Sequence, residues 1–322
     1  ITILGSLNMD MVTVTNKVPG PGETVLAESF STGCGGKGAN QAVAAARLTQ
    51  FHPDERRTAG VQMIGAVGCD DFGVRLKEGL QKSGVDVEFV KEVSSAGTGT
   101  ATITVEKETG ENRIMVVSGA NQEVVTADQL ADEFDYGKVL LCQLECPVET
   151  VLGHLKRASR LKTGQNRTKT ILNPSPTIPL PKETFKFVDY LVVNETEGQF
   201  YARELGEKDS SPANPSLTDQ ATTLLEYVNS GVIITLGGRG VYYAKKEDGE
   251  IHTAILAATE VEKVVDTTAA GDTFVGAFAS WLARGDKKSY TNEWQFLETA
   301  IQFGQDAAAW AVQRPGAQDS IP

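Results

Sequence analysis

The sequence of 322 residues is poor in several residue types that common chemistries require. Its four cysteines, Cys34, Cys69, Cys142 and Cys146, do not stand at the spacing of a zinc site. We therefore expect reduced thiols and a cytoplasmic protein, with the nucleus as a second location if the source is eukaryotic. No apolar run reaches the roughly 18 residues of a membrane helix, and the first residues lack the basic and apolar regions of a signal peptide.

Histidine is also scarce. The three in the chain, His52, His154 and His252, stand apart from its glycine-rich loops. No serine occupies a nucleophile-elbow motif, and we expect Cys142 and Cys146 to be buried. These features disfavour a histidine-based mechanism and nucleophilic catalysis.

The chain carries an excess of acid, with a formal net charge of −12 and a pI near 4.9. No dense cluster of lysine and arginine alternates with aromatic residues, so nucleic acid is not expected as a partner. An anionic ligand would have to be held by local N–H groups, a few basic side chains and a metal ion, against an unfavourable overall field. No shift of composition divides residues 1–322, which we expect to form a single domain.

Several short apolar runs are continuous rather than alternating, as in strands that are buried on both faces. Helical stretches such as residues 147–162 and 222–230 separate them. The pattern predicts an α/β fold with a central, mostly parallel sheet flanked by helices. Residues 1–12 are expected to form one buried strand, and the other runs are VQMIGAVG, KVLLCQLE, TKTILNP, DYLVVNE and GVIITLGG.

Residues 12–33 and 97–118 differ from these runs, because apolar and polar positions alternate there around hairpin-like turns. They predict a small exposed sheet beside the main one. Polar or proline-rich insertions near residues 51–60, 162–169 and 208–219 are expected to be surface loops.

Polar side chains follow five of the predicted strands, at the points where the apolar runs stop. Asparagine, aspartate and glycine end strands in any protein, so one or two such positions need no function. Five predict a shared crevice, because open parallel sheets bind ligands at the carboxyl ends of their strands. Carboxylates and amides suit a ligand with many hydroxyl groups. The positions are Asn8, Asp10, Gln143, Glu145, Asn173, Asn194, Glu195, Glu197, Thr235, Gly237 and Gly238.

Residues 266–274 read DTTAAGDTF, which predicts a loop that becomes a helix near Gly271. An ordinary helix start accounts for much of this, because aspartate satisfies free N–H groups and offsets the helix dipole. The functional alternative is that Ala269, Ala270 and Gly271 leave backbone N–H groups uncovered for an anionic oxygen. Asp272 is then the best candidate for a catalytic base.

Two further glycine-rich loops stand in similar positions. GCGGKGANQAVAAARL, residues 33–48, matches neither the Walker A motif nor a dinucleotide-binding fingerprint. Its glycines either let a helix pack close to the sheet or bring backbone against a small polar ligand that Lys37 and Asn40 contact. TLGGRG, residues 235–240, is either a tight turn or one wall of a nucleotide site.

The motifs GGKGANQA, NETE, TLGGRG and DTTAAGDTF occur in this order, and together they resemble those of the ribokinase-like, or PfkB-type, carbohydrate kinases. The resemblance covers nearly the whole chain. NMD at residues 8–10, the lysine of GGKGAN, QLE at 143–145 and the ending RPGAQDSIP are similar to members that phosphorylate ribose rather than to adenosine kinases or fructokinases. The resemblance implies a Rossmann-like, three-layer fold whose small sheet is a lid over the sugar and a homodimer contact.

It further implies phosphoryl transfer from ATP to the 5-hydroxyl of D-ribose, with Mg²⁺ bridging the phosphates. Asp272 would take the proton of the attacking hydroxyl, while the N–H groups of Ala269, Ala270 and Gly271 stabilise negative charge. Kinases for fructose, 2-keto-3-deoxygluconate or adenosine, and a sugar-binding protein without turnover, remain as alternatives. The implied sugar-binding residues are Asn8, Asp10, Gly36, Lys37, Asn40, Glu145 and Asp272.

For the nucleotide, the resemblance implies contacts to ATP and two metal ions. Glu197 would act on Mg²⁺ through water, because magnesium keeps several of its waters. A monovalent cation, usually K⁺, would lie beside the anion loop. Gly238 stands where serine is frequent and Thr268 where a branched apolar residue is common, which leaves the fine nucleotide contacts open. The implied ATP residues are Asn194, Thr235, Gly237, Gly238, Gly240, Gly271 and Gln305, and the implied monovalent-cation residues are Asp266, Thr268, Ala311, Arg314, Gly316 and Ser320.

Overall fold

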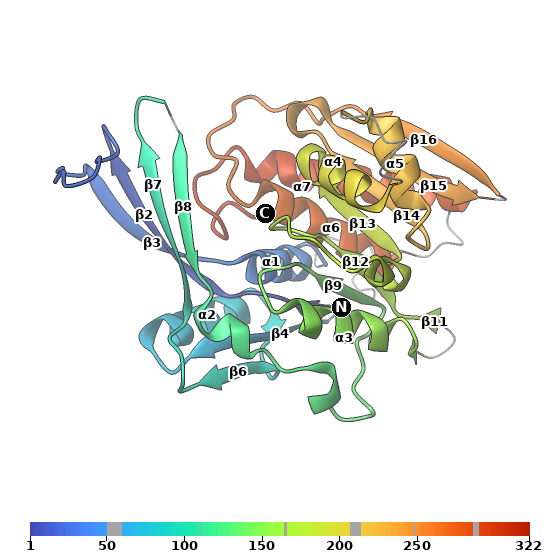
Figure 1. Cartoon of the computed structure of the whole chain (residues 1–322), viewed down its shortest axis with the longest axis horizontal. Coiled ribbons are helices and arrows are strands. Elements are labelled where there is room, and N and C mark those ends of the chain that lie inside the picture. Colours follow the sequence, from blue (N-terminus) through green and yellow to red (C-terminus); the bar gives the residue numbers. More distant parts are fainter. Residues whose placement is uncertain (50–59, 110, 164–165, 207–213, 248, 286–289) are drawn as a thin grey trace.

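The computed structural model describes residues 1–49, 60–109, 111–163, 166–206, 214–247, 249–285 and 290–322 (Figure 1). His52 and parts of the predicted insertions near 51–60, 162–169 and 208–219 lie outside the described residues. In the described part of the chain, no helix combines the length and the apolar character needed to cross a membrane.

The centre of the molecule is a mostly parallel sheet, as the continuous apolar runs predict. Its strand order is β16-β15-β14-β13-β12-β9-β1-β4-β5, and β6 also pairs with β4. The strands from β14 to β5 run parallel, while β15 and β16 form an antiparallel edge. Their bounds are β1 (Thr2–Leu4), β4 (Val61–Gly68), β5 (Val85–Asp86), β6 (Val90–Val93), β9 (Val139–Cys142), β12 (Lys169–Leu172), β13 (Tyr190–Asn194), β14 (Gly231–Thr235), β15 (Val241–Glu247) and β16 (Glu250–Leu256). A short separate sheet pairs β10 (Lys162–Thr163) with β11 (Asn166–Arg167) in antiparallel orientation.

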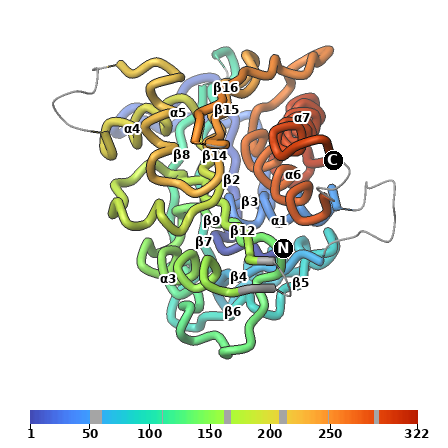
Figure 2. The backbone as a smooth tube through the Cα atoms, turned by 90° about the vertical axis from the view of Figure 1, so that its right-hand side faces the viewer, coloured from blue at the N-terminus to red at the C-terminus, as the bar shows by residue number. Residues whose placement is uncertain are grey.

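Helices cover both faces of the main sheet, which gives the predicted three layers. In Figure 2, α1, α6 and α7 lie on one side and α3, α4 and α5 on the other, and each face has its own buried apolar cluster. The helices are α1 (Lys37–Thr49), α2 (Asp71–Lys82), α3 (Val148–Ala158), α4 (Glu195–Leu205), α5 (Leu217–Leu225), α6 (Ala270–Arg284) and α7 (Glu293–Ala311).

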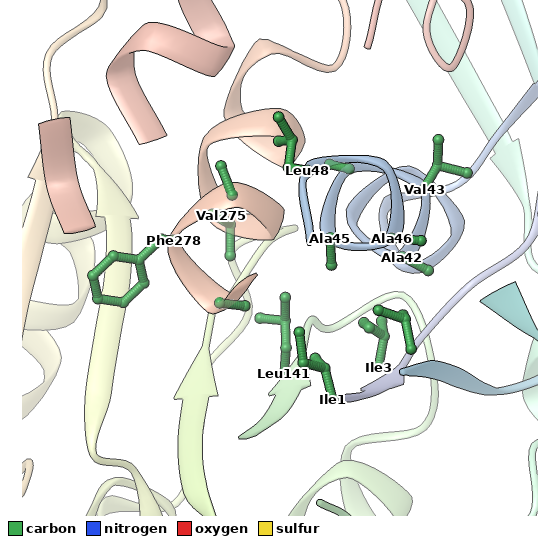
Figure 3. Close-up of a cluster of buried hydrophobic side chains, with 14 of the residues drawn as sticks. Ile1, Ile3, Ala42, Val43, Ala45, Ala46, Leu48, Leu141, Val275 and Phe278 are labelled. Carbon is green, nitrogen blue, oxygen red and sulfur yellow. The ribbon is translucent and has the colours of Figure 1, made fainter. Parts of the chain in front are cut away.

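Helices α1 and α6 pack directly against each other. Figure 3 shows Ala45 of α1, Val275 of α6 and Leu141 of β9 in one buried cluster. A Cβ on Gly276 of α6 would lie 2.6 Å from the carbonyl oxygen of Gln41, so this glycine allows the two helices to approach. The approach matters below, because both helices carry polar side chains into the candidate site.

The prediction of one continuous strand over residues 1–12 is wrong. β1 and β2 belong to different sheets and are separated by residues 5–7. A Cβ on Gly5 would lie 2.7 Å from the Cα of Gly38 and 2.0 Å from the Oε1 atom of Gln143. The start of α1 and the end of β9 thus press against the chain at Gly5, where it leaves the main sheet.

The second sheet projects from one end of the molecule (Figure 1) and has the order β3-β2-β7-β8. This confirms a small sheet separate from the main one, although its first strand begins before residue 12. Its outer strand β8 exposes several apolar side chains, including Met115 and Val117, which are 64% and 63% exposed. The bounds are β2 (Asn8–Thr15), β3 (Ser29–Gly35), β7 (Gly99–Glu106) and β8 (Asn112–Val117).

Candidate active site

Most of the predicted polar strand ends meet along one edge of the main sheet, whereas Asn8 and Asp10 lie on β2 of the second sheet. β1, β9, β12, β13 and β14 are consecutive parallel neighbours, so their carboxyl ends lie side by side. Asn194, for example, is directly paired with Thr235 on the next strand. From β1 the chain builds the sheet outward in both directions, through β4 on one side and β9 on the other. Open α/β sheets bind ligands at such a switch point.

Two glycines bring the loop before α1 against the start of β2. A Cβ on Gly35 would lie 2.1 Å from Oδ2 of Asp10, so a larger residue there would displace that carboxylate. Gly36 has a φ of +90°, and a Cβ there would lie 2.7 Å from the backbone nitrogen of Asn8. We call five of the predicted sugar-binding residues the polar half-site: Asn8 and Asp10 of β2, Lys37 and Asn40 of α1, and Glu145, which follows β9.

Glu145 is anchored in the polar half-site through one of its carboxylate oxygens. Oε2 accepts a hydrogen bond from the backbone N–H of Lys37 at 3.0 Å and another from the hydroxyl of Ser6. Oε1 has no partner among the described residues, so it is available to a ligand hydroxyl. The Lys37 backbone, rather than its side chain, makes the contact to Glu145.

Asp10 and Lys37 have pKa values that reflect the concentration of acid around them. Burial, with the nearby carboxylates of Glu145 and Asp272, raises the pKa of Asp10 to about 7. For Lys37, burial favours the neutral amine, but Asp272, Glu145 and Glu197 outweigh it and raise the pKa. The Asp10 carboxylate has no hydrogen-bond donor within the described chain. A carboxylate that receives no hydrogen bond from the chain is suited to accept hydrogen bonds from ligand hydroxyls.

Asp272 is buried in the first turn of α6 and receives two hydrogen bonds from α1. The Asn40 Nδ2 group donates to Oδ2 at 3.0 Å, and the Gln41 Nε2 group donates to Oδ1 at 2.9 Å. The Oδ1 atom of Asn40 is buried and has no partner among the described residues. Asp272 is therefore held against the polar half-site, next to an open acceptor.

The residues before Asp272 have an unusual backbone. Ala269 has φ 58° and ψ 10°. All other positive φ angles among the described residues belong to glycines. An alanine in this left-handed region is strained by roughly 1–2 kcal/mol, and such strain is common at functional sites. The Ala270 N–H donates to the Thr267 carbonyl at 3.2 Å, whereas the N–H groups of Ala269 and Gly271 have no partner in the described chain. Two of the three predicted N–H groups are thus open to an anion.

A pocket that we call the glycine-lined pocket adjoins Gly271. It runs between β14, the segment 258–264 and α7. A Cβ on Gly237, Gly238 or Gly271 would meet no other atom within 4 Å, so packing within the chain does not require glycine there. The side chain of Gln305 donates to the Ala257 carbonyl at 3.2 Å. The predicted nucleotide residues that line the pocket are Thr235, Gly237, Gly238, Gly240, Gly271 and Gln305.

Asn194 and Glu197 do not line this pocket; they cap α4. The Asn194 side chain accepts from the Glu197 N–H at 2.8 Å, and the Glu197 carboxylate accepts from the Asn194 N–H at 2.9 Å. Glu195 forms an ion pair with Arg239 of the TLGGRG loop. Among the described residues, no three His, Cys, Asp or Glu side chains gather as a metal site. A hydrated ion that ligand phosphates hold needs no such cluster.

The predicted monovalent-cation residues come from two segments, which the structure joins. Asp266 accepts from the N–H and hydroxyl of Thr268, at 2.9 and 2.6 Å, and from the N–H of Gly316 at 2.9 Å. Although burial acts in the opposite direction, these bonds lower the pKa of Asp266. The neighbouring carbonyl of Ala311 accepts from the N–H of Arg314 at 3.1 Å, and Ser320 is buried.

Some residues of the site were not predicted. Gln41 contacts Asp272 and stands next to Asn40 in GGKGANQA, so the motif itself is its only sequence signal. Asn121 accepts from the N–H of Leu7 at 2.9 Å and donates to Oδ1 of Asn8 at 2.8 Å, although it is 113 residues from Asn8. No local pattern marks such a distant contact.

Comparison with known proteins agrees with this geometry. Residues 1–322 match the sequence profile described as pfkB family carbohydrate kinase. A ribokinase of Schizosaccharomyces pombe is 43% identical over 327 residues, which cover 100% of this chain and 94% of that protein. The crystal structure of ribokinase from Thermotoga maritima has a TM-score of 0.81 at 34% identity, covering 100% of this chain and 95% of the other. The structure of Arabidopsis thaliana ribokinase complexed with ribose and ATP has a TM-score of 0.79 at 26% identity, with the same coverage.

Proposed function

The chain belongs to the pfkB family of carbohydrate kinases, and on this premise we propose that it transfers the γ-phosphoryl group of ATP to the 5-hydroxyl of D-ribose. One observation carries the proposal. Asp272 shares hydrogen bonds with the polar half-site, while the adjacent Gly271 lines the glycine-lined pocket. A phosphoryl acceptor and a nucleotide that occupied these two spaces would meet at Asp272.

The polar half-site is suited to a small polyhydroxyl ligand. The Asp10 carboxylate and the free Oε1 of Glu145 accept hydrogen bonds from the sugar hydroxyls, and the buried Oδ1 of Asn40 offers a third acceptor. The Lys37 ammonium donates to a sugar oxygen and offsets the surrounding acid. Gly36 lets the backbone of the loop approach the ligand.

Asp272 acts as the general base. It takes the proton of the attacking hydroxyl as the new oxygen–phosphorus bond forms and the bond between the γ-phosphorus and the bridging oxygen of ADP breaks. The open N–H groups of Ala269 and Gly271 stabilise negative charge on the moving phosphoryl group. Positioning and charge neutralisation are most of what this reaction requires.

The glycine-lined pocket fits ATP, because three of its glycines leave space that a Cβ would fill. Thr235, Gly240 and Gln305 would lie along the nucleotide, while Asn194 supports the phosphates from the start of α4. Mg²⁺ would neutralise phosphate charge, with Glu197 facing its waters. Since Glu197 is engaged in capping, we propose an outer role for it rather than direct ligation.

A monovalent cation, K⁺ by preference, would bind where the Asp266 and Gly316 segments meet, using Asp266 and carbonyl groups from 268, 311, 314, 316 and 320. Its chemical role would be to fix the loop that carries the anion-binding N–H groups. If the site exists, added KCl should raise the melting temperature more than added NaCl, the matched salt. Equal curves for the two salts would count against K⁺ selectivity.

The small sheet would act as a lid over the sugar and, through its exposed apolar strand β8, as a homodimer contact. Sedimentation at two protein concentrations tests the dimer, and Met115→Glu should dissociate it. The four thiols are free. This state fits a reducing compartment, and we propose the cytoplasm.

The proposed reaction is tested by sugar-dependent ADP release over a panel of D-ribose, fructose, 2-keto-3-deoxygluconate and adenosine. Ribose should give the highest kcat/KM. If ribose is not among the best substrates, the proposed acceptor is wrong, and another member of the panel takes its place. If no sugar raises ADP release but calorimetry detects ribose binding, the chain is a binding protein rather than a kinase.

A further inference from the structure

We propose that Gln41 is a positioning residue that assigns separate tasks to the two oxygens of Asp272: Oδ1 is held by the protein, and Oδ2 accepts the substrate proton. The proposal rests on the proposed function, since it concerns the base of that reaction. It is based on a buried network of amide side chains. The network joins Asp272 to α1, to β13 and to the residues that follow β9 and β12.

The network begins at a fixed backbone group. The carbonyl of Val192 on β13 accepts from Nδ2 of Asn173 at 2.9 Å. Because a carbonyl can only accept, the Asn173 amide must turn its Nδ2 toward it and its Oδ1 the other way. That Oδ1 accepts from Nε2 of Gln41 at 3.1 Å.

The orientation of Gln41 follows from this. Its Nε2 donates to both Asn173 Oδ1 and Asp272 Oδ1, and its Oε1 accepts from Nε2 of Gln143 at 2.6 Å. If the Gln41 amide were turned over, its oxygen would face two other oxygens, one of them on a carboxylate. Gln41 and Gln143 have no solvent exposure, so water could not relieve this conflict. The N–H of Gln41 is therefore committed to Asp272.

The other oxygen of Asp272 has different surroundings. Oδ2 accepts from Asn40, whose own side chain belongs to the polar half-site and offers the unpartnered Oδ1 beside it. A carboxylate oxygen accepts more than one hydrogen bond, so Oδ2 keeps capacity for a substrate hydroxyl. The hydrogen bond from Gln41 to Oδ1 fixes the plane of the Asp272 carboxylate. In this orientation, the free lone pair of Oδ2 points toward the substrate.

Replacing Gln41 should therefore impair the chemical step more than sugar binding. In Gln41→Leu we expect kcat to fall roughly 10- to 100-fold, since a small misplacement of a catalytic group has effects of that order, while the dissociation constant for ribose changes less than about threefold. The matched control is Gln220→Leu. Gln220 is also a buried glutamine, but it donates to the Pro215 carbonyl, away from the site. That variant should lose stability and keep kcat.

Gln41→Glu separates positioning from packing by its pH dependence. At high pH the introduced carboxylate lies against Asp272 and has no proton to donate, whereas at lower pH its protonated form can donate an O–H to Oδ1. The ratio of its kcat to that of the parent should rise as the pH falls from about 8.5 to about 6, while the ratio for Gln41→Leu stays flat. A purely structural role would not produce this difference.

The parent enzyme separates failure of this proposal from failure of the proposed function. If the parent does not phosphorylate ribose, the function is wrong. If the parent is active and Gln41→Leu keeps kcat within about twofold, or loses ribose affinity as much as kcat, the positioning role is wrong. Should Gln41→Leu not fold, Gln143→Leu replaces it. That variant leaves the Gln41 oxygen unpaired and should lower kcat several-fold at constant ribose affinity, and an unchanged kcat would overturn the proposal.

Discussion

The polar half-site and the glycine-lined pocket adjoin the same helix start but are built differently. In the polar half-site, side chains are held by specific hydrogen bonds and by close contacts, such as the Asp10 carboxylate against Gly35. In the glycine-lined pocket, Gly237, Gly238 and Gly271 face open space, and Thr235 and Gln305 are among its few polar side chains. Side chains would therefore recognise a ligand in the polar half-site, whereas backbone groups and the shape of the cavity would recognise a ligand in the glycine-lined pocket. Small substitutions should therefore impair ligand binding strongly in the polar half-site and only mildly in the glycine-lined pocket.

The largest effect is expected where the two regions join, from Asp272→Asn. The amide keeps the shape of the side chain but cannot take a proton, so kcat should fall by about 10²- to 10⁴-fold. Ribose affinity, measured by calorimetry, should change much less than kcat, because the variant loses only one of the two hydrogen bonds that Asp272 accepts from Asn40 and Gln41. Activity equal to that of the parent would remove Asp272 from the role of base.

Gly35→Ala should have the next largest effect. The new methyl group would lie 2.1 Å from Oδ2 of Asp10 and must displace that carboxylate. The KM for ribose should rise by roughly 100-fold, in line with the effect of a displacement of about 1 Å, while the KM for ATP is nearly unchanged. Gly33→Ala is the matched control on the same strand, because a Cβ at Gly33 meets nothing within 4 Å. Equal kinetics for the two variants would contradict the packing argument.

Asp10 gives the polar half-site a pH dependence. With a pKa of about 7, Asp10 in the free enzyme is protonated in more acidic solution and then no longer accepts two sugar hydroxyls. The kcat/KM for ribose should fall about tenfold per pH unit below 7, and this limb should be absent from Asp10→Asn. An identical acid limb in the variant would assign it to another group.

The same pKa predicts a change in stability. The folded chain retains a proton that the unfolded chain, with an Asp pKa near 3.8, releases. The stability contributed by protonated Asp10 is complete below 3.8 and is lost as the pH rises toward 7. Asp10→Asn should therefore gain stability relative to the parent across this window, as urea unfolding at pH values near 4 and 8 would show.

The sequence predicted the main sheet because strands buried on both faces are continuously apolar, and their polar ends were visible for the same reason. It predicted the gathering of Lys37, Asn40 and Asp272 only through motifs. The bonds among Gln41, Gln143 and Asn173 join residues 102 and 132 positions apart, so only the packing of α1 on the sheet reveals them. The break after β1 was missed because it depends on close contacts between Gly5 and residues that are distant in the sequence.

The smallest effect on activity is expected in the glycine-lined pocket, from Gly271→Ala. A Cβ there meets nothing within 4 Å, and alanine favours a helix by about 1 kcal/mol over glycine, so the melting temperature should rise slightly. The methyl group would occupy space next to the phosphates and raise the KM for ATP a few-fold, with ribose affinity unchanged. Gly276→Ala on the same helix is the contrast: its Cβ would lie 2.6 Å from the Gln41 carbonyl oxygen, and it should destabilise the fold by roughly 1–3 kcal/mol. If Gly271→Ala instead raised the KM for ribose, Gly271 would belong to the polar half-site rather than to the glycine-lined pocket.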